Sequence, residues 1–221
     1  MRAMILAAGR GERMRPLTDT VPKPLLEVAG KPLIVHTIER LKQGGISEIV
    51  VNFAHLGRQI VDQLGDGSQF GVSITYSDES NGALETGGGI FNALRLLGAE
   101  PFVVINSDVW TDFPIAQLPR SLSGLAHLVL VENPGHHQSG DFFLDGTLVN
   151  LDHGQRLTFS GIGVYSPRLF EGVTEKCFSL VPLLHKAMIN HQVTGQHYNG
   201  VWVDVGTPER LSSLNQALLG G

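Results

Sequence analysis

The chain has 221 residues, of which 42% are hydrophobic and 17% charged, and its formal net charge is −5. This length fits one domain, and the composition excludes an intrinsically disordered chain, which would hold fewer apolar residues and a larger net charge. The apolar runs are far shorter than the roughly 18 residues of a membrane span, and the acidic total argues against general nucleic-acid binding.

The N-terminus and the cysteine content indicate the cellular compartment. The stretch from Met1 to Gly9 has one positive charge and too short an apolar segment, and it runs straight into an arginine-rich loop, so it favours a first β-strand over a signal peptide. Cys177 is the only cysteine and cannot form an intramolecular disulfide. We therefore expect a reducing cytoplasm, with Cys177 as a small buried hydrophobe rather than a nucleophile. A monomer is the favoured oligomeric state.

Short apolar runs alternate with amphipathic stretches, the pattern of a mainly parallel sheet covered by helices on both faces. In chain order, strands are predicted at Ala3–Ala8, Glu48–Phe53, Val72–Tyr76, Phe102–Asn106 and His127–Val131, and helices at Pro32–Gln43, Leu56–Leu64 and Gly88–Leu97. A hairpin turning at Asp145-Gly146, a strand at Leu157–Tyr165 and helices at Leu180–Asn190 and Pro208–Leu219 are expected after them. The predicted class is a single-domain, three-layer α/β fold.

A glycine-rich turn at Gly9 and Gly11 follows the first predicted strand. A turn of this kind at the carboxyl end of a parallel strand lets backbone N–H groups approach a phosphate closely. Two familiar phosphate loops do not fit. The dinucleotide fingerprint needs a third glycine where Met14 stands, and no Gly-Lys-Ser/Thr follows to make a nucleoside-triphosphatase loop.

Positive charge is concentrated around this turn. The first 31 residues hold six Lys/Arg and three acids, which leaves +3 there and −8 in the rest of the chain. Arg10, Arg13 and Arg15 lie in the loop, and Lys23 stands between two prolines that make its segment stiff. The pattern predicts a local anion site, although an exposed basic loop of no consequence explains these residues equally well.

Two aspartates lie in apolar surroundings at the ends of predicted strands. Asp108 follows the run Val103–Asn106, and Asp204 lies within Trp202-Val203-Asp204-Val205-Gly206-Thr207. A shielded carboxylate usually has a cation partner, and Mg²⁺ usually takes one or two carboxylates together with waters and phosphates. The alternatives are a helix N-cap for Asp108 and a turn residue before a Thr207 cap for Asp204.

The motif Leu6-Ala7-Ala8-Gly9-x-Gly11-x-Arg13-x-x-Pro16-Leu17-Thr18, followed by Pro22-Lys23-Pro24-Leu25 and Val28-x-Gly30-x-Pro32-Leu33-Ile34, resembles the N-terminal signature of sugar-1-phosphate nucleotidyltransferases. The resemblance implies a nucleotide-binding part at about residues 1–131 and a sugar-binding part at about 132–221. It implies catalytic roles for Arg13, Lys23, Asp108 and Asp204, with Mg²⁺ held by the two aspartates. It further implies nucleotide contacts at Ala8, Gly9, Gly11, Glu12, Arg13, Lys23, Gly82 and Gly87, and sugar-phosphate contacts at Glu85, Asn106, Gly140 and Asp152.

The loop from about Glu79 to Gly88 would contact the base and the sugar. The three glycines at 87–89 would let a planar ring approach the backbone, unless they are merely a flexible helix start. The pair His136-His137 favours a surface loop over a metal site, because adjacent histidines point in different directions. Glu132-Asn133-Pro134 lacks the lysine with which several larger relatives bind the sugar phosphate.

Together these segments are similar to the uridylyltransferases of bacterial peptidoglycan recycling. That similarity implies UTP and N-acetylmuramate 1-phosphate as substrates, and UDP-N-acetylmuramate and pyrophosphate as products. A guanylyltransferase or other nucleotidyltransferase acting on mannose or heptose 1-phosphate is the alternative within the family. A non-catalytic nucleotide-sugar sensor and a glycosyltransferase are alternatives from other classes, but the Asp-x-Asp motif of a glycosyltransferase does not occur.

Overall fold

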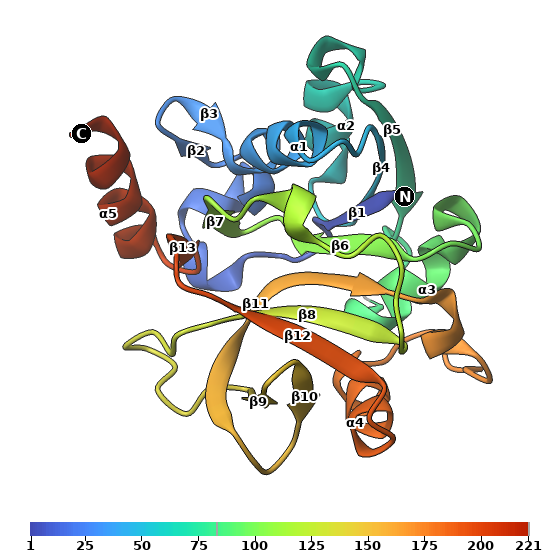
Figure 1. Ribbon diagram of the computed structural model, residues 1–221. Coiled ribbons are helices and arrows are strands. Elements are labelled where there is room, and N and C mark those ends of the chain that lie inside the picture. Colours follow the sequence, from blue (N-terminus) through green and yellow to red (C-terminus); the bar gives the residue numbers. More distant parts are fainter. Residues whose placement is uncertain (83, 221) are drawn as a thin grey trace.

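The computed structural model describes residues 1–82 and 84–220. Its centre is a nine-stranded sheet in the order β5-β4-β1-β6-β11-β8-β12-β10-β9 (Figure 1). In chain order these strands are β1 (Ala3–Leu6), β4 (Glu48–Phe53), β5 (Ser73–Asp78), β6 (Phe102–Asn106), β8 (Ala126–Val131), β9 (Phe142–Asp145), β10 (Leu148–Asn150), β11 (Gln155–Tyr165) and β12 (Val193–Tyr198). Two small sheets accompany it, formed by β2 (Glu27–Val28) with β3 (Lys31–Pro32) and by β7 (Val109–Thr111) with β13 (Trp202–Asp204).

The sheet has two halves that differ in strand direction. β5, β4, β1 and β6 are parallel to one another, as expected. β11 then pairs antiparallel with both β6 and β8, and β9 and β10 form an antiparallel hairpin. Antiparallel strands need only short connections, whereas parallel strands need crossovers. The half of the sheet from β11 to β9 therefore contains both parallel and antiparallel pairs. The sequence pattern, in contrast, predicts a mainly parallel sheet.

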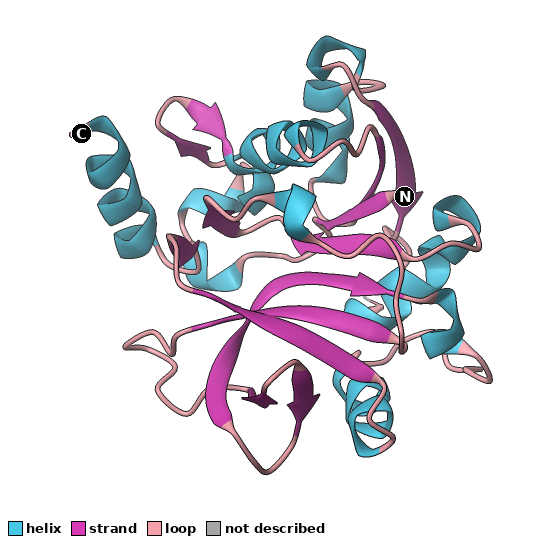
Figure 2. Cartoon of the chain, in the orientation of Figure 1, coloured by secondary structure: helices cyan, strands magenta, loops and turns pink. Residues whose placement is uncertain are grey.

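Helices cover both faces of the sheet, which confirms the expected α/β architecture (Figure 2). Successive residues of a strand point to opposite faces, so Ile5 of β1 joins one buried cluster while Met4 joins the other. The first cluster is covered by α1 (Leu33–Gln43) and α2 (Gly57–Leu64), and the second by α3 (Glu85–Leu97) and α4 (Val181–Ile189). A third cluster lies under α5 (Pro208–Leu219).

The predicted helices and strands are all present, with ends that differ by a few residues. The expected hairpin turns at Gly146, where φ is 59°, a left-handed conformation that favours glycine. β7, β12 and β13 escape the sequence analysis because they are short or interrupted by polar residues. Cys177 is exposed, which corrects its expected burial.

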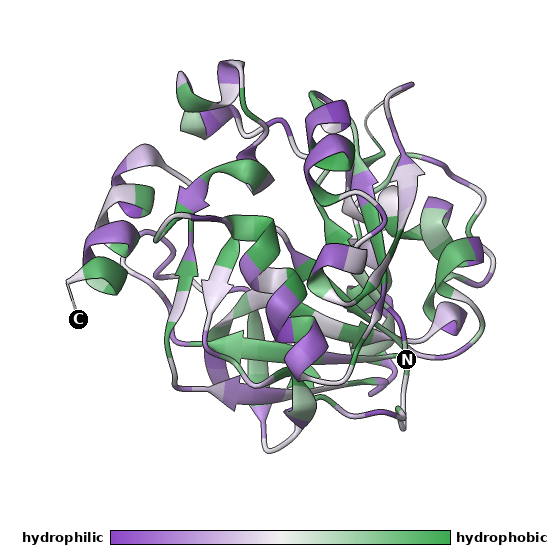
Figure 3. Cartoon of the chain, turned by 90° about the horizontal axis from the view of Figure 1, so that it is seen from above, coloured by the Kyte–Doolittle hydropathy of each residue, from purple (hydrophilic) through white to green (hydrophobic). Residues whose placement is uncertain are grey.

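Hydrophobic residues gather on the strands, while the helices carry both hydrophobic and hydrophilic residues (Figure 3). Among the described residues, no helix is both long and apolar enough to cross a membrane.

The centre of the sheet is expected to carry much of the stability. Ile5 is fully buried in β1 between Val51 and Ile105, so Ile5→Ala should lower the free energy of unfolding by about 2–5 kcal/mol. The control Ile189→Ala removes a side chain that is 70% exposed and should change it by less than about 0.5 kcal/mol. Urea unfolding followed by circular dichroism measures both, and equal effects would contradict the assignment of this core.

Candidate active site

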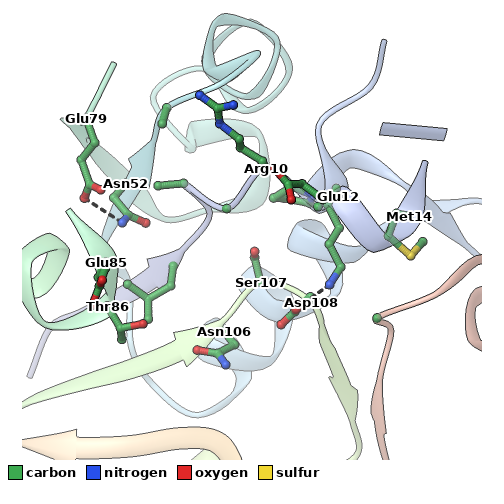
Figure 4. A pocket seen from close by; sticks show the side chains of 18 of the residues that line it. Arg10, Glu12, Met14, Asn52, Glu79, Glu85, Thr86, Asn106, Ser107 and Asp108 are labelled. Atoms are coloured by element: carbon green, nitrogen blue, oxygen red, sulfur yellow. Dashed lines mark hydrogen bonds and ion pairs between the residues drawn. The ribbon is translucent and has the colours of Figure 1, made fainter. Parts of the chain in front are cut away.

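A cavity of about 580 Å³ opens where β1, β4 and β6 end (Figure 4). Ligand sites of open α/β sheets commonly lie at the carboxyl ends of parallel strands, because the loops leaving those strands converge there. The turn from Ala8 to Met14 forms one wall, and Asn106, Ser107 and Asp108 lie beside it. A second cavity of about 380 Å³ adjoins the first and shares Arg13, Asn106 and Asp108 with it.

The glycine-rich turn is fixed against the lysine segment. Gly11 has φ of 65°, and a Cβ added to it would lie 3.1 Å from the Cβ of Lys23. Thr18 donates a hydrogen bond from Oγ1 to the Gly11 carbonyl over 2.8 Å. A residue with a side chain is strained at this left-handed position and crowds Thr18 and Lys23, so the close approach of the turn to the lysine segment favours glycine.

Lys23 forms an ion pair with Asp108 at the floor of the cavity. Nζ lies 2.5 Å from Oδ2, and the lysine side chain is only 10% exposed. Lys23 begins a short 3₁₀ helix between Pro22 and Pro24, which holds its charge in place as the sequence predicts. Two shielded charges of opposite sign compensate one another here. Figure 4 shows this contact as a dashed line.

Strand pairing brings the second aspartate to the first. Asp108 lies in the turn between β6 and β7 rather than at a helix N-terminus. β13 pairs antiparallel with β7 so that Asp204 lies opposite Val109, and the Val205 N–H donates to the Asp108 carbonyl over 2.9 Å. Asp204 ends β13, and Thr207 is the N-cap of α5 as predicted. Both aspartates line the second cavity.

The two carboxylates are suited to a divalent cation. Lys23 contacts Oδ2 of Asp108, and Arg210 donates to Oδ2 of Asp204 over 3.1 Å. Within residues 1–82 and 84–220, Oδ1 of each aspartate has no hydrogen-bond partner. No group of three His, Cys, Asp or Glu that could hold a metal occurs in this described part. A cation here would therefore complete its shell with waters and ligand phosphates, which is how Mg²⁺ usually binds.

The opposite side of the first cavity carries a buried polar chain. Asn52 of β4 accepts the Ala7 N–H through Oδ1 and donates from Nδ2 to Oε1 of Glu79 over 2.8 Å. Glu79 follows β5 and is only 5% exposed. Burial raises the pKa of the Glu79 carboxyl, and the hydrogen bond from Asn52 opposes that shift in part. In Figure 4 this pair lies on one side of the pocket and Asp108 on the other.

The three glycines of α3 pack against protein atoms rather than facing open space. A Cβ on Gly87 would come 2.5 Å from the Phe178 ring, one on Gly88 2.2 Å from the Lys176 carbonyl, and one on Gly89 2.9 Å from Oε1 of Glu79. They let α3 approach the segment at 176–178 and the Glu79 carboxyl. The structure therefore explains the three glycines by close packing.

The structure brings most of the predicted site residues together. The first cavity is lined by Ala8, Gly9, Gly11, Glu12, Arg13, Lys23, Glu85, Asn106 and Asp108, and the second by Arg13, Asn106, Asp108 and Asp204. Glu85 begins α3 with φ of 59°, a strained conformation of the kind that clusters at functional sites.

Four predicted residues line neither cavity: Gly82, Gly87, Gly140 and Asp152. Gly140 has φ of 60° in a turn, and a Cβ there would lie 2.6 Å from Oδ1 of Asn133. Asp152 is exposed in the segment between β10 and β11. Gly82 is exposed and Gly87 is buried beneath Phe178.

The sequence analysis missed Asn52, His136 and Arg210 at the site. A polar residue inside the apolar run Glu48–Phe53 is a signal that would have identified Asn52. No recognised sequence motif marks Arg210, which contacts Asp204 because the start of α5 turns it back toward that residue. His136 lies exposed in a surface loop, as predicted, and it also lines the second cavity and contacts Arg210.

The family model described as "Nucleotidyl transferase" matches residues 2–140. An N-acetylmuramate alpha-1-phosphate uridylyltransferase of Neisseria meningitidis is 54% identical, with 100% of this chain and 99% of that protein aligned. A protein of the same name from Caulobacter vibrioides is 37% identical over 94% of this chain and 92% of its own length. A mannose-1-phosphate guanylyltransferase catalytic subunit beta of Drosophila pseudoobscura is 32% identical, and the chain spans 64% of its length.

A solved structure with a similar fold is HddC from Yersinia pseudotuberculosis in complex with GMP-PN. Its TM-score is 0.80 at 23% identity, with 98% of this chain and 99% of that chain covered. At this identity the likeness concerns the fold alone.

The raised pKa of Glu79 predicts a pH-dependent stability. The folded state keeps a proton that the unfolded chain has lost, so it binds more protons, and stability falls as pH rises from the ordinary value of 4.5 through the folded-state pKa. Relative to Glu79→Gln, the wild-type protein should therefore lose free energy of unfolding over this range and level off above it. Urea unfolding between about pH 4.5 and 8 measures the difference.

The exposed residue Glu171 offers a control, because Glu171→Gln removes the same charge outside the cavity. A difference between wild type and Glu79→Gln that stays constant with pH would contradict the assignment.

Proposed function

The chain belongs to the nucleotidyl transferase family, and we propose that it transfers UMP from UTP to N-acetylmuramate α-1-phosphate, with UDP-N-acetylmuramate and pyrophosphate as products. The observation that carries this proposal is the likeness to the Neisseria relative, which extends over the full length of both chains. The two adjoining cavities support it, because the reaction needs a nucleotide and an acceptor side by side. Family membership makes the protein an enzyme rather than a sensor.

The proposed reaction forms one bond and breaks one. A phosphate oxygen of the sugar 1-phosphate attacks the α-phosphorus of UTP, the bond from that phosphorus to the bridging oxygen breaks, and pyrophosphate leaves. Such a transfer needs positioning and charge compensation rather than a protein nucleophile. The backbone at Gly9 and Gly11 binds the triphosphate, and Arg13 and Lys23 compensate its negative charge.

Asp108 and Asp204 are the proposed ligands of Mg²⁺. The bound ion supplies Lewis-acid stabilisation of the charge that develops on the phosphate oxygens. Lys23 and Arg210 each hold one carboxylate through Oδ2, which orients the other oxygen. The triphosphate then lies on the Lys23 side of the first cavity, and the base lies toward Glu79 and Asn52.

A guanylyltransferase acting on mannose 1-phosphate is the second candidate function, favoured by the 32% identity to the Drosophila subunit.

The proposed enzyme acts in the cytoplasm. Cys177 is the only cysteine of the sequence, and together with UTP as the proposed substrate it supports this compartment.

The substrate assignment is tested by a grid of nucleoside triphosphates against sugar 1-phosphates. We expect pyrophosphate release to be fastest with UTP and N-acetylmuramate 1-phosphate in the presence of Mg²⁺. Because each nucleotide is paired with each sugar 1-phosphate, the rate of pyrophosphate release identifies the preferred base and the preferred sugar separately. Activity confined to GTP with mannose or heptose 1-phosphate would overturn the substrate assignment and leave the nucleotidyl transfer intact.

The metal assignment is tested by Asp108→Asn and Asp204→Asn. Each change removes one ligand charge, so kcat should fall by about a hundredfold or more. The thermal unfolding midpoint should stay above the assay temperature, so that both variants are folded during the measurement. Mn²⁺ binding, measured by electron paramagnetic resonance with UTP present, should weaken in both variants. Asp62→Asn, on the exposed side of α2, is the matched control. Near-normal turnover in either site variant would exclude that aspartate as a ligand.

A further inference from the structure

The second cavity is lined by two histidines, His136 and His137, that the proposed mechanism does not use. It adjoins the nucleotide cavity at Asp108 and is also lined by Asp204. If the proposed function holds, the acceptor enters here, because its phosphate oxygen must reach the α-phosphorus beside the two aspartates. A sugar 1-phosphate is an anion, so two carboxylates alone would repel it. The cavity needs donors that bind its phosphate.

Most polar side chains around this cavity are already committed to other partners. His137 bonds through Nε2 to Oδ1 of Asp141, over 3.0 Å, and Asp141 also accepts the Phe159 N–H. Asn133 accepts from Thr158 through Oδ1 and donates to the Arg156 carbonyl. Asn133 therefore stabilises the loop at 133–141 and is not directed to a ligand.

His136 differs from these residues. Its side chain is 43% exposed, it lines the cavity, and its Nε2 lies 2.5 Å from Nη1 of Arg210. In the tautomer that satisfies this contact Nε2 accepts, because a guanidinium can only donate, and the ring proton lies on Nδ1. Nδ1 is thus the donor that the ring offers. Nε2 also lies 3.5 Å from Oδ2 of Asp204. Arg210 also donates to Asp204, so one guanidinium orients a carboxylate and an imidazole together.

The loop that carries His136 is held from both ends. Asn133 fixes its start to β11, and Asp141 fixes its end through the Phe159 N–H. A donor held in this way loses little conformational entropy when it binds a ligand.

We infer that His136 binds the phosphate of the sugar 1-phosphate through Nδ1–H, and that Arg210 is its positioning residue. This inference rests on the proposed function, since it names the group that holds the acceptor of that reaction. It assigns to a histidine the contact for which the chain has no lysine after Glu132.

The test is His136→Asn, with His191→Asn as its matched control. His191 is exposed at the end of α4 with φ of 52°, a conformation that asparagine tolerates. Loss of one hydrogen bond to a charged group should raise the KM for N-acetylmuramate 1-phosphate about tenfold. The KM for UTP, the Mn²⁺ affinity and the melting temperature should stay close to wild type, and the control should change none of them.

Two fragments decide which acceptor group His136 holds. N-acetylglucosamine 1-phosphate carries the phosphate without the lactyl carboxylate, and N-acetylmuramate carries the carboxylate without the phosphate. Their binding is followed by the intrinsic tryptophan fluorescence of the protein, to which Trp202 in the cavity contributes. His136→Asn should weaken the first fragment and leave the second unchanged.

An unchanged KM for the acceptor, or weakening of N-acetylmuramate alone, would overturn the inference. If the wild-type protein releases no pyrophosphate from UTP and N-acetylmuramate 1-phosphate, the proposed function itself is overturned. The two failures are therefore distinguishable.

Discussion

The antiparallel pairing of β13 with β7 is the contact on which the site depends. It places Asp204 opposite Val109 and ties the Val205 N–H to the Asp108 carbonyl. Two aspartates that lie far apart in the sequence thereby reach one cavity. Side-chain contacts support the pairing: Thr111 donates to the Val201 carbonyl, and the Trp202 indole donates to the Ser160 carbonyl. The strand pair is short, so these contacts help to hold the separation of the two carboxylates.

Charge compensation follows from that arrangement. Two carboxylates in one cavity repel each other unless cations lie nearby. Lys23 and Arg210 each contact one of them, and Arg10 and Arg13 line the first cavity together with Lys23. The modest net charge of −5 therefore conceals two opposed local fields. In the proposed mechanism this arrangement suits a reaction in which negative charge moves from one phosphate to another.

Glycine shows where local patterns inform and where they mislead. At Gly11 the motif indicates a glycine-rich turn, and the structure shows that this turn is left-handed and lies against Lys23. At Gly87, Gly88 and Gly89 the same residue type serves packing against Phe178, the Lys176 carbonyl and Glu79, which no local pattern distinguishes from an approach to a ligand. In both cases the absent Cβ leaves space beside the backbone, and the segments of the protein that pack there determine what fills it.

The α/β architecture, the stiff lysine segment, the Thr207 cap and the two acidic segments can be predicted from the amino-acid sequence, because each is encoded in periodicity or in residues close together along the chain. The antiparallel position of β11 beside β6, the pairing of β13 with β7 that brings Asp204 to Asp108, and the contact of Arg210 with His136 are seen in the folded structure alone. These contacts join segments separated by many residues, and their free energy comes from packing and pairing that no local pattern records.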